Sequence, residues 1–323
     1  MKFTRNNKLC EKLIILDGLH GTGKSVLAPI IGSLRDVEKQ IVDKHFNTIC
    51  ALSYMNKIDD DAVKVYLQLY TDISIYNSMI SREINFRPSD NSSIFNNPNS
   101  IQYIKRFLSN KEGKRIVNEI KEKEKALFIV TNTIFQTSKI LFKTFKSDCF
   151  LIKLTRHPLY IIDKWLKIID NKNKLSQFLM VKDKSNNLIP WYATEIKNYS
   201  KMSSLDKAIH LIYKSFEMQN SAETNMSNYE KKNCIVIPYE LFIFNSETWI
   251  IKIIEKSNLV TSELTKHWTK KMIKNKKKLL IDKNYHDIKL NWLIKNSSSE
   301  SYNLFKKISD DYSLRYKLLD FMP

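Results

Sequence analysis

A glycine-rich segment near the start of the chain carries residue types that bind phosphate groups. It reads Gly18-Leu-His-Gly-Thr-Gly-Lys24-Ser25 and fits the pattern G-x-x-x-x-G-K-[ST] at every fixed position. Glycines let backbone N–H groups turn toward an anion, and Lys24 adds a full positive charge. Because an apolar run precedes the segment and a helical pattern follows it, we predict a strand, P-loop and helix over residues 13–35. The residues expected to bind the phosphate groups of a nucleotide are Gly18, Gly21, Thr22, Gly23, Lys24 and Ser25.

Two residues of this segment are candidates for catalysis. Lys24 can stabilise negative charge that develops on a group in transfer. His20 can deprotonate an acceptor hydroxyl or donate a hydrogen bond to the transferred group. The alternative for His20 is a loop side chain that faces solvent.

The net charge of +19 is large, but only eight of the 53 basic residues are arginines. Proteins that read nucleic-acid sequence usually depend on arginine for bidentate contacts. We therefore expect an anionic ligand and no specific nucleic-acid binding. The four cysteines are scattered, without the paired spacing of a zinc site or a disulfide framework.

No apolar run approaches the roughly 20 residues that a membrane-spanning helix needs. The first residues are polar, and the apolar run after them is too short for a signal peptide. We expect no membrane span and a protein that stays in the cytoplasm.

Short, nearly continuous apolar runs predict strands that are buried on both faces. Helix-length segments such as Phe135–Phe145 and Leu159–Ile169 follow some of these runs. This alternation predicts an α/β fold with a parallel β-sheet flanked by helices. The predicted strands are Leu13–Leu16, Ala126–Thr131, Cys149–Leu154 and Cys234–Ile237.

Residues 36–125 predict a mostly helical insertion, with helices over Asp60–Ile80 and Ser100–Lys123. The looser segment Asn85–Asn99 within it is expected to cap the ligand cleft, and Asn171–Asn187 is expected to be mostly loop. We expect one P-loop domain over residues 1–268 and a Lys-rich helical segment over 269–323, whose lysines between 270 and 278 are candidates for contact with a nucleotide phosphate.

Two later segments give the chain a resemblance to a known family. The predicted strand Cys149–Leu154 is followed by Arg156-His157-Pro158 and a helix that carries Lys164, and Cys234–Ile237 is followed by Pro238-Tyr239-Glu240-Leu241. Together with the P-loop, this order resembles the sulfotransferases. The resemblance implies 3′-phosphoadenosine-5′-phosphosulfate as the donor, with Arg156 and Lys164 on its 3′-phosphate. It also implies transfer of a sulfuryl group to a hydroxyl or amine, without a metal.

The P-loop leaves two other functions open. Sulfotransferases commonly carry Lys-x-Gly-Thr-[ST] there, whereas Lys24-Ser25 is the pair that kinases use for phosphates and Mg²⁺. An ATP- or GTP-dependent kinase, with Ser25 as a Mg²⁺ ligand, is therefore the second hypothesis. A nucleotide-binding module without catalysis is the third. Asp17-Gly18 before the loop also resembles nucleoside-phosphate kinases, but neither Ala126–Thr131 nor Cys149–Leu154 ends in an Asp suited to a kinase metal site.

The sulfotransferase hypothesis makes a geometric prediction. The strands Leu13–Leu16 and Cys149–Leu154 should be parallel, so that Arg156 and the P-loop border one pocket at the carboxyl edge of the sheet. The guanidinium is expected on the order of 10 Å from the loop amides, a spacing suited to the two ends of one nucleotide.

Overall fold

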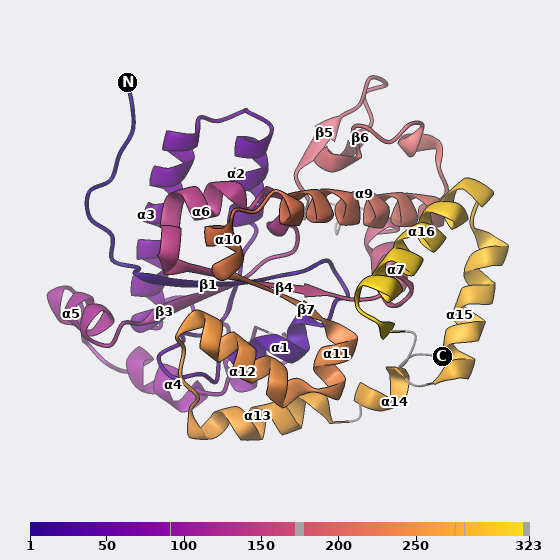
Figure 1. The fold of residues 1–323 in the computed structure, drawn as a ribbon. Helices are drawn as coiled ribbons and strands as arrows, with labels where there is room; N and C mark the ends of the chain where they lie inside the picture. Colours follow the sequence, from indigo (N-terminus) through magenta and orange to yellow (C-terminus); the bar gives the residue numbers. More distant parts are fainter. Residues whose placement is uncertain (91, 172–177, 275, 281, 319–323) are drawn as a thin grey trace.

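A parallel β-sheet of five strands forms the centre of the molecule, in the order β2-β3-β1-β4-β7 (Figure 1). The computed structural model describes residues 1–90, 92–171, 178–274, 276–280 and 282–318. The strands are β1 (Lys12–Asp17), β2 (Ile41–Val42), β3 (Ala126–Val130), β4 (Cys149–Thr155) and β7 (Cys234–Pro238). The α/β prediction and the four predicted strands are confirmed.

The strand β1 lies between β3 and β4, and Leu13 is the register partner of both Leu127 and Cys149. Its side chains alternate between two cores, because successive side chains of a strand point to opposite faces. Leu13 and Ile15 lie in one apolar cluster, and Ile14 and Leu16 lie in another. The sheet is therefore covered on both faces, as its apolar strands require.

Helices from distant parts of the sequence cover these two faces (Figure 1). The cluster that holds Ile14 includes side chains of α1, α11 and α12, with α13 packed beside α1, whereas that of Leu13 includes side chains of α2, α3, α5 and α6. The helices around the first cluster are α1 (Lys24–Ile31), α11 (Tyr239–Phe244), α12 (Ser246–Ser257), α13 (Glu263–Ile273) and α14 (Lys276–Leu280). Those of the second are α2 (His45–Tyr54), α3 (Asp60–Met79), α5 (Lys114–Glu122) and α6 (Lys139–Phe145), with η2 (Phe135–Thr137) before α6 and η3 (Lys146–Asp148) after it.

A third apolar cluster joins α7, α9, α15 and α16 at the right of Figure 1. The C-terminal helices therefore share a core with the helix that follows β4. This part comprises α7 (Pro158–Ile169), the hairpin β5 (Met180–Lys182) and β6 (Leu188–Pro190), η4 (Trp191–Ala193), η5 (Tyr199–Lys201), α9 (Ser204–Thr224), α15 (Lys283–Asn296) and α16 (Ser299–Arg315). The short helix α10 (Asn228–Lys232) leads into β7.

The segment 36–125 differs from the sequence-based prediction in two ways. The strand β2 lies within it, and the single helix expected over Ser100–Lys123 is two helices, α4 (Ser100–Phe107) and α5. Gly113 lies directly before α5 with a φ of +64°, which a right-handed helix does not allow, and the chain therefore breaks between the two helices. Within Asn85–Asn99, the only described helical turn is η1 (Ile94–Asn96).

The looser segment Asn85–Asn99 does not lie over the P-loop, contrary to the prediction that it caps the cleft. Asn99 Nδ2 donates to the carbonyl of Gly32, 3.4 Å away, at the opposite end of α1 from Lys24. Polar side chains in the segment bond mostly to one another; Asn85, for example, donates to Asp90 and to Ser92. The segment is therefore a surface element beside the far end of α1.

The C-terminal part is helical, as predicted, and α13 extends across position 268. Residues 172–177 of the predicted loop Asn171–Asn187, and parts of the lysine-rich stretch 270–278, lie outside the described residues. Where the structure describes the chain, no helix combines the length and the apolar character needed to cross a bilayer.

Candidate functional site

The P-loop joins β1 to α1 at the carboxyl edge of the sheet. Gly21 and Gly23 have φ values of +94° and +96°, which side-chain-bearing residues rarely adopt. A Cβ atom on Gly18 would lie 2.3 Å from the carbonyl oxygen of Leu154, so β4 approaches the loop too closely for any other residue. Three glycines of the motif are therefore required by backbone geometry.

Lys24 is folded into the loop. Its Nζ donates to the carbonyl oxygens of Gly18 and Leu19, the latter at 3.2 Å. Burial lowers the pKa of Lys24 to about 8, although the charge of Asp17 partly opposes this shift. An anion in the loop would offer Lys24 a stronger partner than these carbonyl oxygens. Of the neighbouring hydroxyls, Thr22 is buried and donates to Leu19 at 2.8 Å, whereas Ser25 is exposed.

Arg156 follows β4 and lies against the P-loop. The strands β1 and β4 are parallel, as predicted, and Arg156 Nη1 donates to the carbonyl oxygen of Gly21 at 3.0 Å. The expected separation of about 10 Å is therefore wrong. The guanidinium lies over the ring of Tyr239, 4.5 Å from its centroid, and this packing turns it toward the loop. Its Nε is buried and has no hydrogen-bond partner among the described residues.

Tyr239 and Glu240 follow β7, and Tyr239 packs against the loop. A Cβ on Gly23 would lie 2.3 Å from Tyr239 Cε2, so the tyrosine ring covers this glycine. Glu240 is fully buried, accepts from His157 N at 3.0 Å and from Tyr312 Oη at 2.7 Å, and has a pKa that burial raises. The sequence analysis named Tyr239 and Glu240 only as part of the segment that resembles sulfotransferases. Their place directly after a buried strand was the signal that could have marked them as site residues.

Lys164 and His20 lie on the α7 side of the loop. A Cβ atom on Gly21 would lie 3.3 Å from Lys164 Cβ, which places the start of this exposed side chain beside the loop. The His20 ring packs edge-on against Trp165 and Phe178, with centroid distances of 6.1 and 5.7 Å. Burial, and after it the charges of Lys24, Lys164 and Lys44, lower the pKa of His20 to about 3. His20 is therefore neutral at pH 7.

Lys44 is a cation near the loop that the sequence did not reveal. It follows β2, whose carboxyl end is at the same edge of the sheet as the P-loop. Its charge acts on His20, as do those of Lys24 and Lys164. The two-residue strand β2 gave no apolar run by which Lys44 could have been placed.

The acidic groups at this edge are already engaged. Asp17 accepts from Thr131 Oγ1 at 2.7 Å and from the amides of Ile134 and Phe135 at 3.1 and 3.0 Å. Asp43 accepts from Phe46 N at 2.7 Å and from the hydroxyl of Tyr70. In the described part of the chain, no group of three or more His, Cys, Asp or Glu side chains is arranged to hold a metal ion. The groups left to meet a ligand at the loop are cations.

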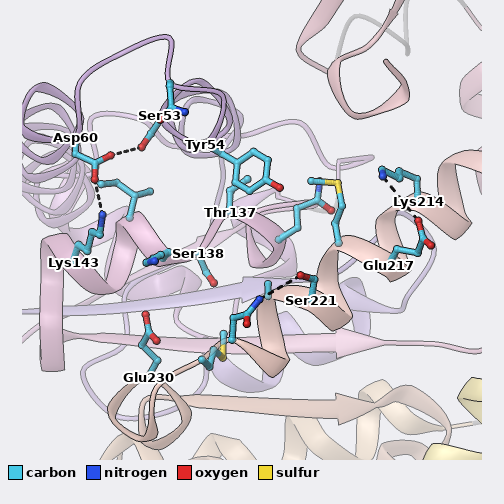
Figure 2. Close-up of a pocket in the computed structure, with 18 residues that line it drawn as sticks. Ser53, Tyr54, Asp60, Thr137, Ser138, Lys143, Lys214, Glu217, Ser221 and Glu230 are labelled. Carbon is cyan, nitrogen blue, oxygen red and sulfur yellow. Dashed lines mark hydrogen bonds and ion pairs between the residues drawn. The ribbon is translucent and has the colours of Figure 1, made fainter. Parts of the chain in front are cut away.

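A separate cavity of about 780 Å³ lies between α2, α6 and α9 (Figure 2). Its lining is polar and of mixed charge, and two of its lysines are ion-paired: Lys143 with Asp60 at 2.7 Å, and Lys214 with Glu217 at 3.9 Å. None of the P-loop residues lines it. We therefore assign the candidate site to the P-loop and its cations rather than to this cavity.

No protein-family model matches the chain, and no curated protein matches it. Solved structures that resemble it include sulfotransferases. The sulfotransferase domain of the Synechococcus PCC 7002 olefin synthase is 9% identical, with a TM-score of 0.41. The match covers 82% of this chain and 79% of that domain. Sulfotransferase STF9 from Mycobacterium avium is 12% identical, with a TM-score of 0.41 and coverages of 95% and 77%. STF1 from Mycobacterium tuberculosis H37Rv is 12% identical, with a TM-score of 0.38 and coverages of 80% and 70%.

Proposed function

We propose that this protein transfers a sulfuryl group from 3′-phosphoadenosine-5′-phosphosulfate to a hydroxyl or amine acceptor. The observation that supports this most is the position of Arg156. It follows the strand beside the P-loop strand, where a P-loop kinase would carry an acidic metal ligand, and it contacts the loop at Gly21. A cation at this place suits a donor with a second phosphate group.

The residues around the loop divide between the two ends of such a donor. The P-loop amides, Lys24 and Ser25 would hold the phosphosulfate. Arg156 and Lys164 would hold the 3′-phosphate, for which the guanidinium of Arg156 would have to leave the carbonyl oxygen of Gly21. The buried, unpartnered Nε of Arg156 is a donor that a phosphate oxygen would satisfy. The unbonded state of this buried group supports the fit of an anion here.

In the proposed reaction, the acceptor oxygen or nitrogen attacks sulfur, and the bond from sulfur to the bridging phosphate oxygen breaks. The acceptor proton passes to a base, and adenosine 3′,5′-bisphosphate leaves. Lys24 and the loop amides stabilise the charge that grows on the leaving phosphate. No step in this scheme requires a divalent metal.

His20 is the base that we propose. It is neutral at pH 7, as a base must be, but burial and three lysines hold its pKa at about 3, which makes it a weak base in the free protein. A donor anion would offset the charges of Lys24, Lys44 and Lys164 and so raise this pKa. Its neutral imidazole can also donate a hydrogen bond to a sulfuryl oxygen.

A kinase is the second candidate, because Lys24-Ser25 completes the pattern that kinases use with Mg²⁺. The exposed Ser25 hydroxyl would then be a metal ligand. The engagement of Asp17 and Asp43 leaves this metal without an evident carboxylate ligand nearby. We therefore rank this candidate below the sulfotransferase.

The test is calorimetric binding of adenosine 3′,5′-bisphosphate and of AMP to matched variants. Arg156→Gln should weaken the bisphosphate at least about tenfold and change AMP little, because AMP lacks the 3′-phosphate. Lys24→Ala should weaken both ligands. Arg115→Gln, an exposed arginine on α5, is the control and should change neither. Equal loss of both ligands in Arg156→Gln, or no loss, would remove the assignment of Arg156 to a 3′-phosphate.

A further inference from the structure

The helix α4 directs an apolar stripe toward solvent. Ile101, Ile104 and Leu108 follow one another at helical spacing on one side, and Ile101 and Leu108 are 68% and 75% exposed. Tyr103, on the other side, is buried. A surface helix normally turns its apolar side inward, so this orientation needs a cause.

That cause is a buried network on the inner side of α4. Arg106 donates to both carboxylate oxygens of Glu38, at 2.6 and 3.1 Å, and Tyr103 Oη donates to the same carboxylate at 2.7 Å. Lys125 lies 3.8 Å from Glu38 and also contacts Asp36 at 2.8 Å. The polar side chains therefore fix the helix, and its apolar side chains remain outside.

Three exposed phenylalanines extend the stripe into a patch. Phe86 and Phe107 pack edge-to-face, with ring centroids 5.8 Å apart, and Phe95 is exposed nearby in sequence. We call the set the α4 patch; its members are Phe86, Phe95, Ile101, Ile104, Phe107 and Leu108.

Basic residues accompany the patch. Between residues 82 and 115 the sequence has seven Lys or Arg and three Asp or Glu; without Arg106, which pairs with Glu38, the net charge is +3. Arg87, Lys105 and Lys111 are exposed. Arg87 directly follows Phe86, and Lys105 directly follows Ile104. The surface therefore combines apolar side chains with excess positive charge.

We propose that the α4 patch binds the surface of a membrane that contains anionic lipids. Exposed Phe, Ile and Leu side chains can enter the boundary between headgroups and acyl chains, and Lys and Arg beside them are attracted to the lipid phosphates. In a twofold contact the same positively charged patch would meet itself on the second copy, and this repulsion opposes self-association through the patch.

The fold sets how such binding would orient the molecule. Glu38, which anchors α4, donates its backbone N–H to Ala126, the first residue of β3, and therefore lies near the amino edge of the sheet. The P-loop lies at the carboxyl edge. In Figure 1, α4 is at the lower left, and α7, which follows Arg156 and borders the loop, is at the right. Membrane binding through the patch would leave the P-loop edge in contact with water.

The test is sedimentation of the full chain with vesicles of phosphatidylcholine, alone or with about 30% phosphatidylserine. The wild-type protein should bind the anionic vesicles, bind the neutral ones at least about tenfold less, and be released by salt. The double variants Ile101→Asp/Leu108→Asp and Arg87→Gln/Lys105→Gln should each lose at least about tenfold in partitioning. Ile288→Asp on α15, where Ile288 is 61% exposed, is the matched control and should bind as the wild type does.

Circular dichroism and an unchanged affinity for adenosine 3′,5′-bisphosphate would show that each variant is folded, and they separate this test from that of the proposed function. Absence of wild-type binding to anionic vesicles would overturn the proposal, as would equal binding by the Ile101→Asp/Leu108→Asp variant. A wild-type dimer in sedimentation velocity that this variant dissociates would assign the patch to self-association instead. An acidic protein that competes for the patch while vesicles do not bind would likewise overturn it.

Discussion

At the scale of single residues, the charge of Lys24 depends on its surroundings. Its ammonium donates hydrogen bonds to carbonyl oxygens of the loop. Burial lowers the pKa of this ammonium to about 8. Lys24 is therefore a cation at pH 7 and loses its proton as the pH rises through 8. A bound phosphate favours the charged form and raises this pKa, so ligand binding takes up a proton above pH 8.

We therefore predict that affinity for adenosine 3′,5′-bisphosphate falls about tenfold between pH 7 and pH 9. Calorimetry at matched ionic strength measures it. Lys24→Arg is the control, because arginine keeps its charge over this range and its affinity should stay flat. A wild-type affinity that does not change with pH would show that the protonation of Lys24 does not govern binding.

Gly23 supports a second prediction at this scale. Gly23→Ala would combine a φ of +96° with a Cβ only 2.3 Å from the Tyr239 ring, so the loop or the ring must move. We expect nucleotide binding to fall at least about tenfold. Gly113→Ala is the matched control: its φ is +64°, but nothing lies within 4 Å of the added Cβ. It should cost about 1 kcal/mol of unfolding free energy and leave binding unchanged. Equal binding by both variants would mean that the packing of Tyr239 on Gly23 does not shape the loop.

At the scale of elements, α4 depends on the buried carboxylate of Glu38. Burial alone would raise the pKa of Glu38, but its bonds to Arg106 and Tyr103 and the charge of Lys125 outweigh this effect and lower it. The stabilisation is therefore present above the ordinary glutamate pKa and is lost as the pH falls through the lowered value.

Arg106→Ala should lower the unfolding free energy by about 3 kcal/mol at pH 7, because it leaves a buried carboxylate with one cation fewer. The deficit should shrink in acid as Glu38 becomes protonated. Urea denaturation measures both effects, and Arg115→Ala, which removes an exposed arginine from α5, should stay within about 0.5 kcal/mol of the wild type. A deficit for Arg106→Ala no larger than that of the control would show that this network does not hold α4.

The same scale shows which elements a sequence can predict. The strands β1, β3, β4 and β7 are continuous apolar runs because both faces of the sheet are covered, and each was predicted. The strand β2 has only two residues, and the hairpin β5–β6 has strands of three, so neither gave a periodic signal. The break before α5 depends on one glycine in a polar stretch.

Site residues divide in the same way. The glycine-rich pattern of the P-loop is local in sequence, so it can be found without a structure, and its glycines stand where the backbone requires them. The contact of Arg156 with Gly21 and the cover of Gly23 by Tyr239 depend on strands that are far apart in the chain. Lys44 reaches the site only because β2 pairs with β3. These contacts are tertiary, and residue spacing alone cannot give them.

At the scale of the whole molecule, the C-terminal helices are fastened to the edge of the sheet that carries the site. Tyr312 of α16 donates to Glu240 at 2.7 Å, and Lys289 of α15 pairs with Asp163 of α7 at 2.6 Å. Phe305 and Ile308 lie in one apolar cluster with the side chains of α7 and α9. The last helices thus pack against the segment from Arg156 to Lys164 and stabilise the part of the chain that carries these two cations.

The central claim is that these cations receive a nucleotide with phosphates at both the 3′ and 5′ positions, without a divalent metal. The most direct measurement is calorimetric titration with adenosine 3′,5′-bisphosphate and with ADP, each with and without Mg²⁺. We predict that the bisphosphate binds at least about tenfold tighter than ADP in the absence of Mg²⁺, and that Mg²⁺ changes its affinity less than about twofold. Equal affinities, or binding of ADP only when Mg²⁺ is present, would contradict the account and favour the kinase.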